Sequence, residues 1–336
     1  MLHKRGGIVK FLDVCAGIGG GKLGLESIGW DCIGYSEIDK KAINTYTLLY
    51  GKKEHNYGDL MTIDPDKLPN FDVMIAGFPC QSFSIVGLRQ GLKDARGQII
   101  YGIIDILKNK ATPYFILENV KGLVNHNKGK TIKVISEELD RAGYQTCYKV
   151  LNSLNYGVPQ MRERVYFVGI HKDFQKNSPF FWPQEVETPD IRDYLIDTEN
   201  AILNHHTDET FKRYLNNKYN KNKFDIKELL EEDYLVIDTR QSDLRLYRGA
   251  VPTLRAGRHG ILYVKDGKLR KLTGYESLLL QGFPKKMASE IKGRIPEGHL
   301  LSQAGNAMTV TTIAKIGEQL SKYIRGVDCK WVATGT

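Results

Sequence analysis

The chain has 336 residues, of which 41% are hydrophobic and 26% are charged, and its formal net charge is +9. This composition excludes a disordered chain, and the length suggests about two globular domains. No apolar run approaches the ~18 residues of a membrane-spanning helix, and the polar N-terminal residues do not resemble a signal peptide. The five cysteines are scattered without metal-ligand spacing, so we expect a cytoplasmic protein without disulfides or bound metal.

Apolar runs and amphipathic segments alternate along the first half of the chain. The expected strands are residues 9–14, 31–36, 72–76, 114–117, 144–151 and 164–170, and the expected helices are 20–28, 40–50, 98–109 and 131–142. This alternation predicts an α/β fold with a parallel, doubly wound sheet. Residues 172–238 are polar and break the pattern, and helices return at 273–281 and 310–324. The sequence therefore predicts one α/β domain formed from both ends of the chain, with a smaller domain inserted.

A glycine-rich segment, residues 13–21 (DVCAGIGGG), joins the first expected strand to the first helix. Glycines in such a turn let the backbone approach a ligand closely. Glu37 lies twenty residues after Gly17, at the end of the second strand. In mononucleotide-binding folds an acidic residue there accepts hydrogen bonds from ribose hydroxyls. Residues 19–24 also match GxGxxG, so a dinucleotide-dependent dehydrogenase is one alternative, and a tight turn without a ligand is another.

Cys80 follows the strand expected at 72–76, within the segment 76–84 (AGFPCQSFS). Side chains just past the carboxyl end of a parallel strand are where α/β enzymes carry their sites, and an ionised thiol is a strong nucleophile. Pro79 argues against a continuing core strand. The glycine-punctuated residues 86–97 are typical of a loop that closes over a site. The alternative is a buried, inert cysteine.

Two further sets of polar residues lie at the ends of expected strands. Glu118 ends the buried strand at 114–117, where a carboxylate can serve as an acid or as a partner of a backbone N–H. Gln160, Arg162 and Arg164 alternate along the next strand entry, so they point to one side. Near a cleft these arginines would bind an anion or a substrate carbonyl, and surface ion pairs are the alternative.

Basic residues are concentrated late in the chain. Residues 183–238 contain seven Lys or Arg against fourteen Asp or Glu, whereas residues 239–271 contain nine against two. Such a block indicates a nucleic-acid partner, and a solvated basic surface is the alternative. The guanidinium of arginine can fork onto guanine or phosphate, and the block opens with five arginines: Arg240, Arg245, Arg248, Arg255 and Arg258.

Together these motifs resemble those of the cytosine-5 DNA methyltransferase family of bacterial restriction–modification systems, from about residue 9 to residue 324. The matching segments, in the family's order, are 11–20 (FLDVCAGIGG), Glu37, 58–59 (GD), 77–80 (GFPC), 118–120 (ENV), 160–164 (QMRER), 270–272 (RKL), 281–284 (QGFP) and 303–308 (QAGNAM). The resemblance implies a Rossmann-like doubly wound methyltransferase domain, residues 1–170 plus 270–336. It also implies a smaller inserted target-recognition domain, residues 171–269, that reads DNA.

The resemblance also implies a mechanism. The target cytosine is flipped out of the duplex, because its reacting carbons are inaccessible in the stack. Cys80 adds to C6, and C5 then takes the methyl group of S-adenosylmethionine, leaving S-adenosylhomocysteine. Loss of the C5 proton expels Cys80. Glu118 holds N3 and the exocyclic amine, and Arg162 and Arg164 orient the ring and the thiolate.

The family pattern assigns further residues to ligands. Those assigned to S-adenosylmethionine are Ala16, Gly17, Ile18, Gly19, Gly20, Glu37, Ile38, Asp59, Leu60, Pro79, Ile99, Asn306 and Met308. Those assigned to DNA are Gln81, Ser84, Arg240, Arg245, Thr253, Leu254, Arg255 and Arg258. Residues 251–260 resemble the family's Thr-Leu element. The family usually has Phe, packed on the adenine, at the position of Cys15. The cysteine is expected either to lower the affinity for the cofactor or to be compensated by Ile38 and a neighbouring side chain.

The expected partners are double-stranded DNA and a cognate restriction endonuclease that acts separately, and the expected state is a monomer that binds no membrane. A tRNA cytosine-5 methyltransferase is the nearest alternative, since it shares the catalytic motifs, but the inserted segment and its arginines favour duplex DNA. A binding regulator with an inactive catalytic domain is disfavoured by the intact Cys80, Glu118 and Arg164. An NAD-dependent oxidoreductase would leave the motifs at 79–80 and 160–164 without a role.

Overall fold

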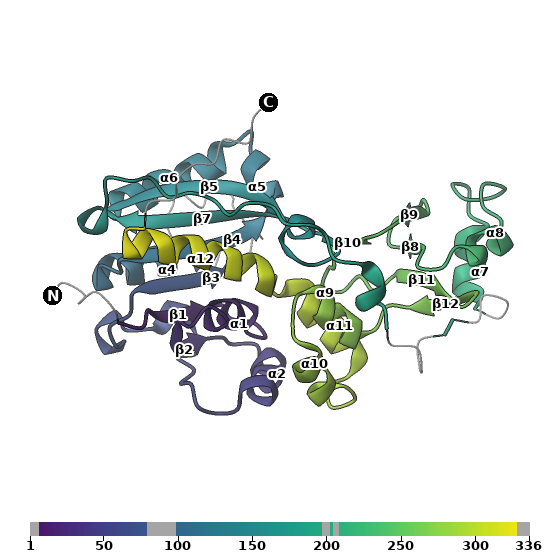
Figure 1. Ribbon diagram of the computed structural model, residues 1–336, viewed down its shortest axis with the longest axis horizontal. Coiled ribbons are helices and arrows are strands. Elements are labelled where there is room, and N and C mark those ends of the chain that lie inside the picture. Colours follow the sequence, from purple (N-terminus) through teal and green to yellow (C-terminus); the bar gives the residue numbers. More distant parts are fainter. Residues whose placement is uncertain (1–6, 79–98, 197–201, 204–207, 328–336) are drawn as a thin grey trace. The chain divides into compact units, whose positions relative to one another are not determined.

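The computed structural model describes residues 7–78, 99–196, 202–203 and 208–327 (Figure 1). The chain divides into two compact units. The first unit consists of Met1–Leu151, Glu163–Glu185 and Met308–Thr336, and the second of Asn152–Arg162 and Val186–Ala307. No helix within the described residues is long and apolar enough to cross a membrane.

The first unit is built on a six-stranded sheet with the order β2-β1-β3-β4-β7-β5 (Figure 1). Its strands are β1 (Lys10–Val14), β2 (Asp31–Ser36), β3 (Val73–Gly77), β4 (Tyr114–Val120), β5 (Tyr144–Asn152) and β7 (Glu163–His171). Strand β1 pairs in parallel with β2 and β3, and β3 pairs in parallel with β4. Both faces of these strands are covered, which explains their nearly continuous apolar sequences.

Strand β7 corrects the expectation of a wholly parallel sheet, because it pairs antiparallel with β4. A parallel neighbour needs a long crossover connection, usually a helix. The described residues between β5 and β7 contain only the 3-10 helix Ser153–Tyr156 and the two-residue strand β6 (Gln160–Met161). The sheet is therefore parallel across β2, β1, β3 and β4, and it becomes mixed where β7 joins β4.

Helices cover the sheet of the first unit. They are α1 (Gly20–Glu26), α2 (Lys40–Tyr50), α4 (Ile99–Lys110), α5 (Gly122–Asn125), α6 (Lys130–Arg141) and α12 (Val310–Arg325). Helices α4 and α6 add Ile103, Ile106, Ile135 and Leu139 to the main core cluster, all at most 1% exposed. Helix α12, the last of the chain, packs against α1, the first. Short 3-10 helices lie at Leu60–Thr62, Pro65–Lys67 and Lys172–Phe174.

The second unit has a small antiparallel sheet with its own core. The sheet order is β12-β11-β8-β9, from β8 (Val236–Asp238), β9 (Arg245–Tyr247), β11 (Ile261–Lys265) and β12 (Lys268–Lys271). Asp266 and Gly267 both have positive φ and form the two-residue turn between β11 and β12. Strand β10 (Val251–Pro252) pairs with β6. The helices are α7 (Glu209–Leu215), α8 (Ile226–Glu231), α9 (Gly274–Leu280), α10 (Lys285–Ile291) and α11 (Glu297–Asn306), with a 3-10 helix at Ile191–Asp193.

The boundaries of the second unit differ from those expected for the inserted domain. The sequence placed residues 270–307 with the α/β domain, but contacts group them with the small sheet. Helix α9 is tied to β11, since the Tyr263 hydroxyl donates to Glu276 at 2.8 Å. Glu276 also completes a capping box with Thr273 at the start of α9. A polar composition also hid α7, α8 and β8, which the sequence analysis did not anticipate.

Candidate active site and nucleic-acid interface

The glycine-rich turn of the first unit follows β1 and begins α1. Gly19, with φ at 79°, is the N-cap of α1. Gly20 lies against the backbone of Met308, and a Cβ there would be 2.3 Å from the Met308 carbonyl oxygen. Only glycine permits this approach, which fixes the turn against Met308, two residues before the start of α12. A Cβ at Gly17 would have no atom within 4 Å, so the turn leaves open space above that position.

Glu37 is tied to this turn by hydrogen bonds. One carboxylate oxygen accepts the Gly17 N–H at 2.8 Å, and the other accepts the N–H groups of Ile38 and Asp39 at 2.8 and 2.9 Å. Each carboxylate oxygen can accept more than one hydrogen bond, so these bonds leave Glu37 able to bind a ribose as well. The ribose contact itself stays a prediction. The Ile38 side chain is 66% exposed, an unusual position for isoleucine and a suitable one for packing against a ligand.

The other residues assigned to the cofactor are distributed over both units. Asp59 is exposed and caps the 3-10 helix that begins at Leu60, whose side chain is buried in the core. Ile99 is half-buried at the start of α4. Ala16, Ile18 and Met308 are buried in the first unit, whereas Asn306 is an exposed residue of the second. Pro79 lies outside the described residues.

Two groups beneath the turn were missed by the sequence analysis. The Tyr50 hydroxyl, on α2, donates to the Gly19 carbonyl at 2.8 Å. Asp13, fully buried on β1, accepts the Lys22 N–H at 2.9 Å. Burial raises the pKa of Asp13 from 3.8 to about 7, although the bond from Lys22 opposes this shift. An acidic residue inside an otherwise apolar strand was the available signal.

Burial also raises the pKa of the described cysteines, to about 12 for Cys15 and Cys32 and to about 11 for Cys147. Thiols with such pKa values stay protonated near neutral pH, so these three are unsuited to nucleophilic attack. Cys80 lies outside the described residues, together with Gln81 and Ser84. Its role as the nucleophile stays a prediction.

Glu118 and Arg164 form a buried ion pair in the first unit. The Arg164 Nε lies 3.1 Å from the Glu118 Oε1, and the two side chains are 12% and 10% exposed. The antiparallel pairing of β4 with β7 brings them together, because Glu118 lies opposite Tyr166 and Arg164 is its diagonal neighbour. The next residue, Asn119, donates to the Phe78 carbonyl at 3.0 Å and so fixes the end of β3 immediately before Pro79.

Arg162 has surroundings different from those that the resemblance implied. Its guanidinium donates to the carbonyls of Leu254 and Gly305, both at 3.1 Å, and of Ala307 at 2.9 Å, and the residue is 2% exposed. It therefore holds the backbone of the second unit instead of presenting its charge to a base. Gln160 is fully buried as well, and its side chain donates to the Leu280 carbonyl at 2.8 Å.

Fewer arginines of the block are available to bind DNA than the sequence suggested. Arg240 is held by both carboxylate oxygens of Asp238 at 2.7 and 2.8 Å, in a pair that is 5% and 7% exposed. Arg245 pairs with Asp243, and Arg248 pairs with Glu232. In the described part of the block the exposed arginines outside these pairs are Arg255 and Arg258.

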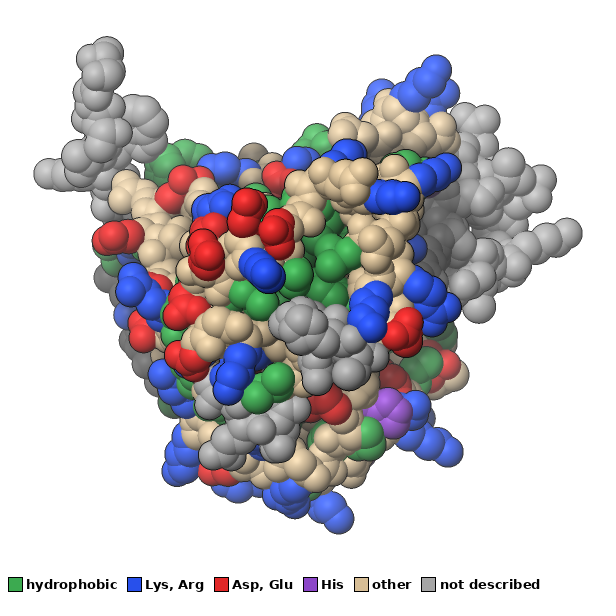
Figure 2. Space-filling model, turned by 90° about the vertical axis from the view of Figure 1, so that its right-hand side faces the viewer, with side chains coloured by type: hydrophobic (Ala, Val, Ile, Leu, Met, Phe, Trp, Pro, Cys, Tyr) green, Lys and Arg blue, Asp and Glu red, His purple; other side chains and the backbone are tan. Residues whose placement is uncertain are grey.

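The Thr-Leu element faces inward. The Thr253 hydroxyl donates to the Met161 carbonyl at 2.6 Å, and the Leu254 N–H donates to the Gln160 side chain at 3.1 Å. Leu254 is only 4% exposed. These two residues therefore anchor the segment and leave the arginines that follow them exposed. In Figure 2, Lys and Arg side chains surround an apolar hollow, with a group of acidic side chains beside it.

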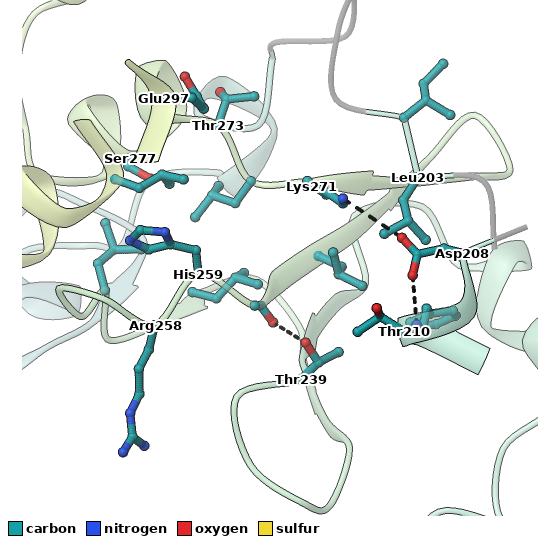
Figure 3. Close-up of a pocket in the computed structure, with 18 of the residues that line it drawn as sticks. Leu203, Asp208, Thr210, Thr239, Arg258, His259, Lys271, Thr273, Ser277 and Glu297 are labelled. Carbon is teal, nitrogen blue, oxygen red and sulfur yellow. Dashed lines mark hydrogen bonds and ion pairs between the residues drawn. The ribbon is translucent and has the colours of Figure 1, made fainter. Parts of the chain in front are cut away.

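A cavity of about 770 Å³ lies within the second unit. Its apolar lining includes Leu203, Phe211 and Leu262, and Lys271 and Asp208 pair at its edge at 4.0 Å (Figure 3). Arg258 extends away from the cavity, whereas His259 points toward the helices (Figure 3). The lining comes from segments spread over residues 202–301, so no local sequence pattern could have indicated it.

The sheet, with its glycine-rich turn after β1 and its acidic residue after β2, defines a Rossmann-like methyltransferase domain. Two solved structures share this fold: Entamoeba histolytica methyltransferase EhMeth (TM-score 0.67, 18% identity, covering 95% of this chain and 98% of that one) and S. pombe Dnmt2 (TM-score 0.63, 20% identity, 94% and 99%). The chain belongs to the C-5 cytosine-specific DNA methylase family, whose model matches residues 9–322. It is thus a DNA cytosine-5 methyltransferase.

Curated relatives are similar over most of their length. Type II methyltransferase M.NgoBI of Neisseria gonorrhoeae is 35% identical over 325 residues, covering 90% of each chain. Type II methyltransferase M.HaeII of Haemophilus aegyptius is 35% identical over 312 residues, covering 91% of each. The family match disfavours the NAD-dependent oxidoreductase that the GxGxxG window left open.

Proposed function

We propose that this enzyme is the modification methyltransferase of a type II restriction–modification system and methylates one cytosine in a specific duplex DNA sequence. The observation that carries the proposal is the buried Glu118–Arg164 pair, beside a strand end that Asn119 fixes just before Cys80. The family match and the names of the relatives M.NgoBI and M.HaeII support the substrate. We further propose that it acts as a monomer in the cytoplasm, with its cognate endonuclease acting separately.

The proposed reaction requires a flipped cytosine, since C5 and C6 are inaccessible in the base stack. The Cys80 thiolate forms a bond with C6, which gives C5 the electron density of an enamine carbon. C5 then forms a bond with the methyl group of S-adenosylmethionine as the bond from that methyl group to sulfur breaks, and S-adenosylhomocysteine leaves. A base removes the C5 proton, the C5–C6 double bond re-forms, and the S–C6 bond breaks to release Cys80.

Glu118 and Arg164 have distinct roles in this proposal. Glu118 binds the N3 edge of the flipped ring and supplies a proton toward N3 as negative charge develops there. Arg164 supplies the counter-charge for the Glu118 carboxyl group within a largely buried site. Arg162 acts at a distance, by holding the backbone at Leu254, Gly305 and Ala307.

The residues around the glycine-rich turn fit S-adenosylmethionine, which supplies an electrophilic methyl group when bound. The open space at Gly17 admits a ligand against the backbone, and the exposed Ile38 offers an apolar surface to an adenine ring. Glu37 already binds the turn and retains acceptor capacity for ribose hydroxyls. The proposal gives Asp59, an exposed N-cap residue, the role of accepting the adenine amine.

The test is to incubate the enzyme with S-adenosylmethionine and mixed-sequence duplex DNA and to map 5-methylcytosine by bisulfite sequencing. We expect methylation in one recurrent sequence context, and its loss in Cys80→Ala. Cys147→Ala, which changes a half-buried cysteine on β5, is the matched control and should retain activity. Methylation of tRNA but not of DNA would overturn the proposal in favour of a tRNA methyltransferase. Inactivity on both would favour a binding regulator.

A further inference from the structure

The segment Thr253 to Gly260, here called the arginine loop, is fixed at both ends by the residues that follow β8. Arg240 donates to the Thr253 carbonyl at 2.7 Å. At the other end, the N–H and the hydroxyl of Thr239 donate to the Gly260 carbonyl at 2.8 and 2.9 Å (Figure 3). Two consecutive residues therefore set the span of the loop.

Arg240 can hold Thr253 because Asp238 holds Arg240. The two side chains form a forked, two-oxygen pair and are almost fully buried. Burial alone would raise the pKa of Asp238, but the hydrogen bonds from Arg240 outweigh it and lower that pKa below its ordinary value. Asp238 therefore remains a carboxylate, and the guanidinium is occupied by Asp238 and Thr253.

The loop is also packed tightly against its supports. A Cβ at Gly260 would lie 2.7 Å from the Thr239 hydroxyl oxygen and 3.1 Å from the Arg240 Cγ. On the α11 side, a Cβ at Gly305 would lie 2.5 Å from the Ala256 nitrogen. The backbone path of the loop is therefore strongly restricted, while Arg255 and Arg258 on it remain exposed.

We propose that Asp238 and Arg240 are positioning residues for DNA recognition: Asp238 fixes Arg240, and Arg240 fixes the backbone from which Arg255 and Arg258 reach DNA. The inference rests on the proposed function in that duplex DNA is the substrate. It replaces the expectation that Arg240 itself contacts DNA. It also explains why an arginine in a basic block is buried against a carboxylate.

The charge of Asp238 and its proposed positioning role predict opposite effects of Asp238→Asn on DNA binding. Removal of one negative charge near a DNA-binding surface should tighten DNA binding if electrostatics alone matters. If Asp238 positions the arginine loop, the same substitution should weaken binding to a duplex that carries the sequence that the wild-type enzyme methylates. We expect the dissociation constant for that duplex to rise about tenfold, the range of a lost specific contact. Binding to a scrambled duplex should change less than twofold.

Asp243→Asn is the matched control, because Asp243 and Arg245 repeat the Asp-x-Arg spacing as an exposed pair. It should leave binding unchanged or tighten it. Arg240→Lys is the second variant: it keeps the charge but cannot bind both Asp238 oxygens and Thr253 at once, so it should resemble Asp238→Asn. A phosphate contact by Arg240 would instead survive this substitution.

The measurement is fluorescence anisotropy with two duplexes, one carrying the context that the wild-type enzyme methylates and one scrambled. Thermal melting and calorimetry with S-adenosylhomocysteine establish that each variant is folded and binds cofactor. The inference would be overturned if Asp238→Asn bound the duplex with the target sequence as tightly as the wild type does. It would also be overturned if the substitution weakened binding to both duplexes equally. A wild-type enzyme that methylates no duplex DNA would instead overturn the proposed function.

Discussion

In the proposed reaction, single residues of the first unit carry the chemistry, and Glu118 is one of them. A buried carboxylate is costly unless it is paired, and Arg164 supplies the pair. Removal of Arg164 leaves Glu118 without its counter-ion in a largely buried position. In the proposed reaction, the pair therefore supports the contact between Glu118 and the base.

We expect Arg164→Ala to lower kcat on duplex DNA by on the order of 100-fold, the usual cost of losing one positioned polar group at a reacting centre. Transfer of a labelled methyl group to DNA measures this, with S-adenosylhomocysteine affinity as the check on folding. Glu163→Gln is the control, because it breaks the neighbouring exposed pair with Lys121 and should change kcat less than twofold. A kcat within threefold of wild type in Arg164→Ala would contradict the role given to the pair.

The raised pKa of Asp13 predicts that the stability of the folded protein depends on pH. Its pKa is about 7 in the folded protein and near 3.8 when exposed, so between these values the folded chain binds the proton more strongly. Its contribution to stability is therefore complete below pH 4 and is lost as pH rises toward 7. Asp13→Asn should gain stability relative to wild type across this window and then level off. Urea denaturation at a series of pH values measures the difference, and a constant offset would contradict the shift.

At the scale of the elements, the alternation of strands and helices was enough to predict the parallel part of the sheet. Each expected strand from 9–14 to 164–170 is present within two or three residues of its predicted ends. The direction of β7 could not be predicted, since local residue patterns do not encode which way a strand runs. Yet this direction brings Arg164 to Glu118.

The junction between the glycine-rich turn and Met308 gives a prediction for an element. Gly20→Ala places a methyl group against a backbone carbonyl that cannot move aside, so we expect a loss of about 1–3 kcal/mol of stability and weaker binding of S-adenosylhomocysteine. Gly298→Ala in α11 is the control, because nothing lies within 4 Å of its Cβ, and it should be neutral or slightly stabilising. Chemical denaturation measures the stability of both variants, and calorimetry measures their affinity for S-adenosylhomocysteine. Unchanged cofactor affinity in Gly20→Ala would show that the junction does not shape the site.

At the scale of the whole molecule, the family and the reaction could be predicted because the motifs are short and ordered along the chain. The division into compact units could not, because it depends on contacts between distant residues. Arg162 binds Leu254, Gly305 and Ala307, which are 92, 143 and 145 residues away. The arginine block shows the same limit, since composition counts Arg240 as a free cation and the structure places it in a buried pair.

The bond between Arg162 and Glu163 separates the two units within a single extended motif. This has a consequence for chimeric enzymes in which recognition specificity is exchanged between relatives. A transplant of residues 171–269 alone would separate Leu254 from Gln160 and Arg162, the host side chains that hold it. A module transferred as 152–162 together with 186–307 keeps these side chains with their partners. The unit that keeps these contacts intact is therefore discontinuous, and its smaller piece lies inside the residues that the sequence assigned to the catalytic domain.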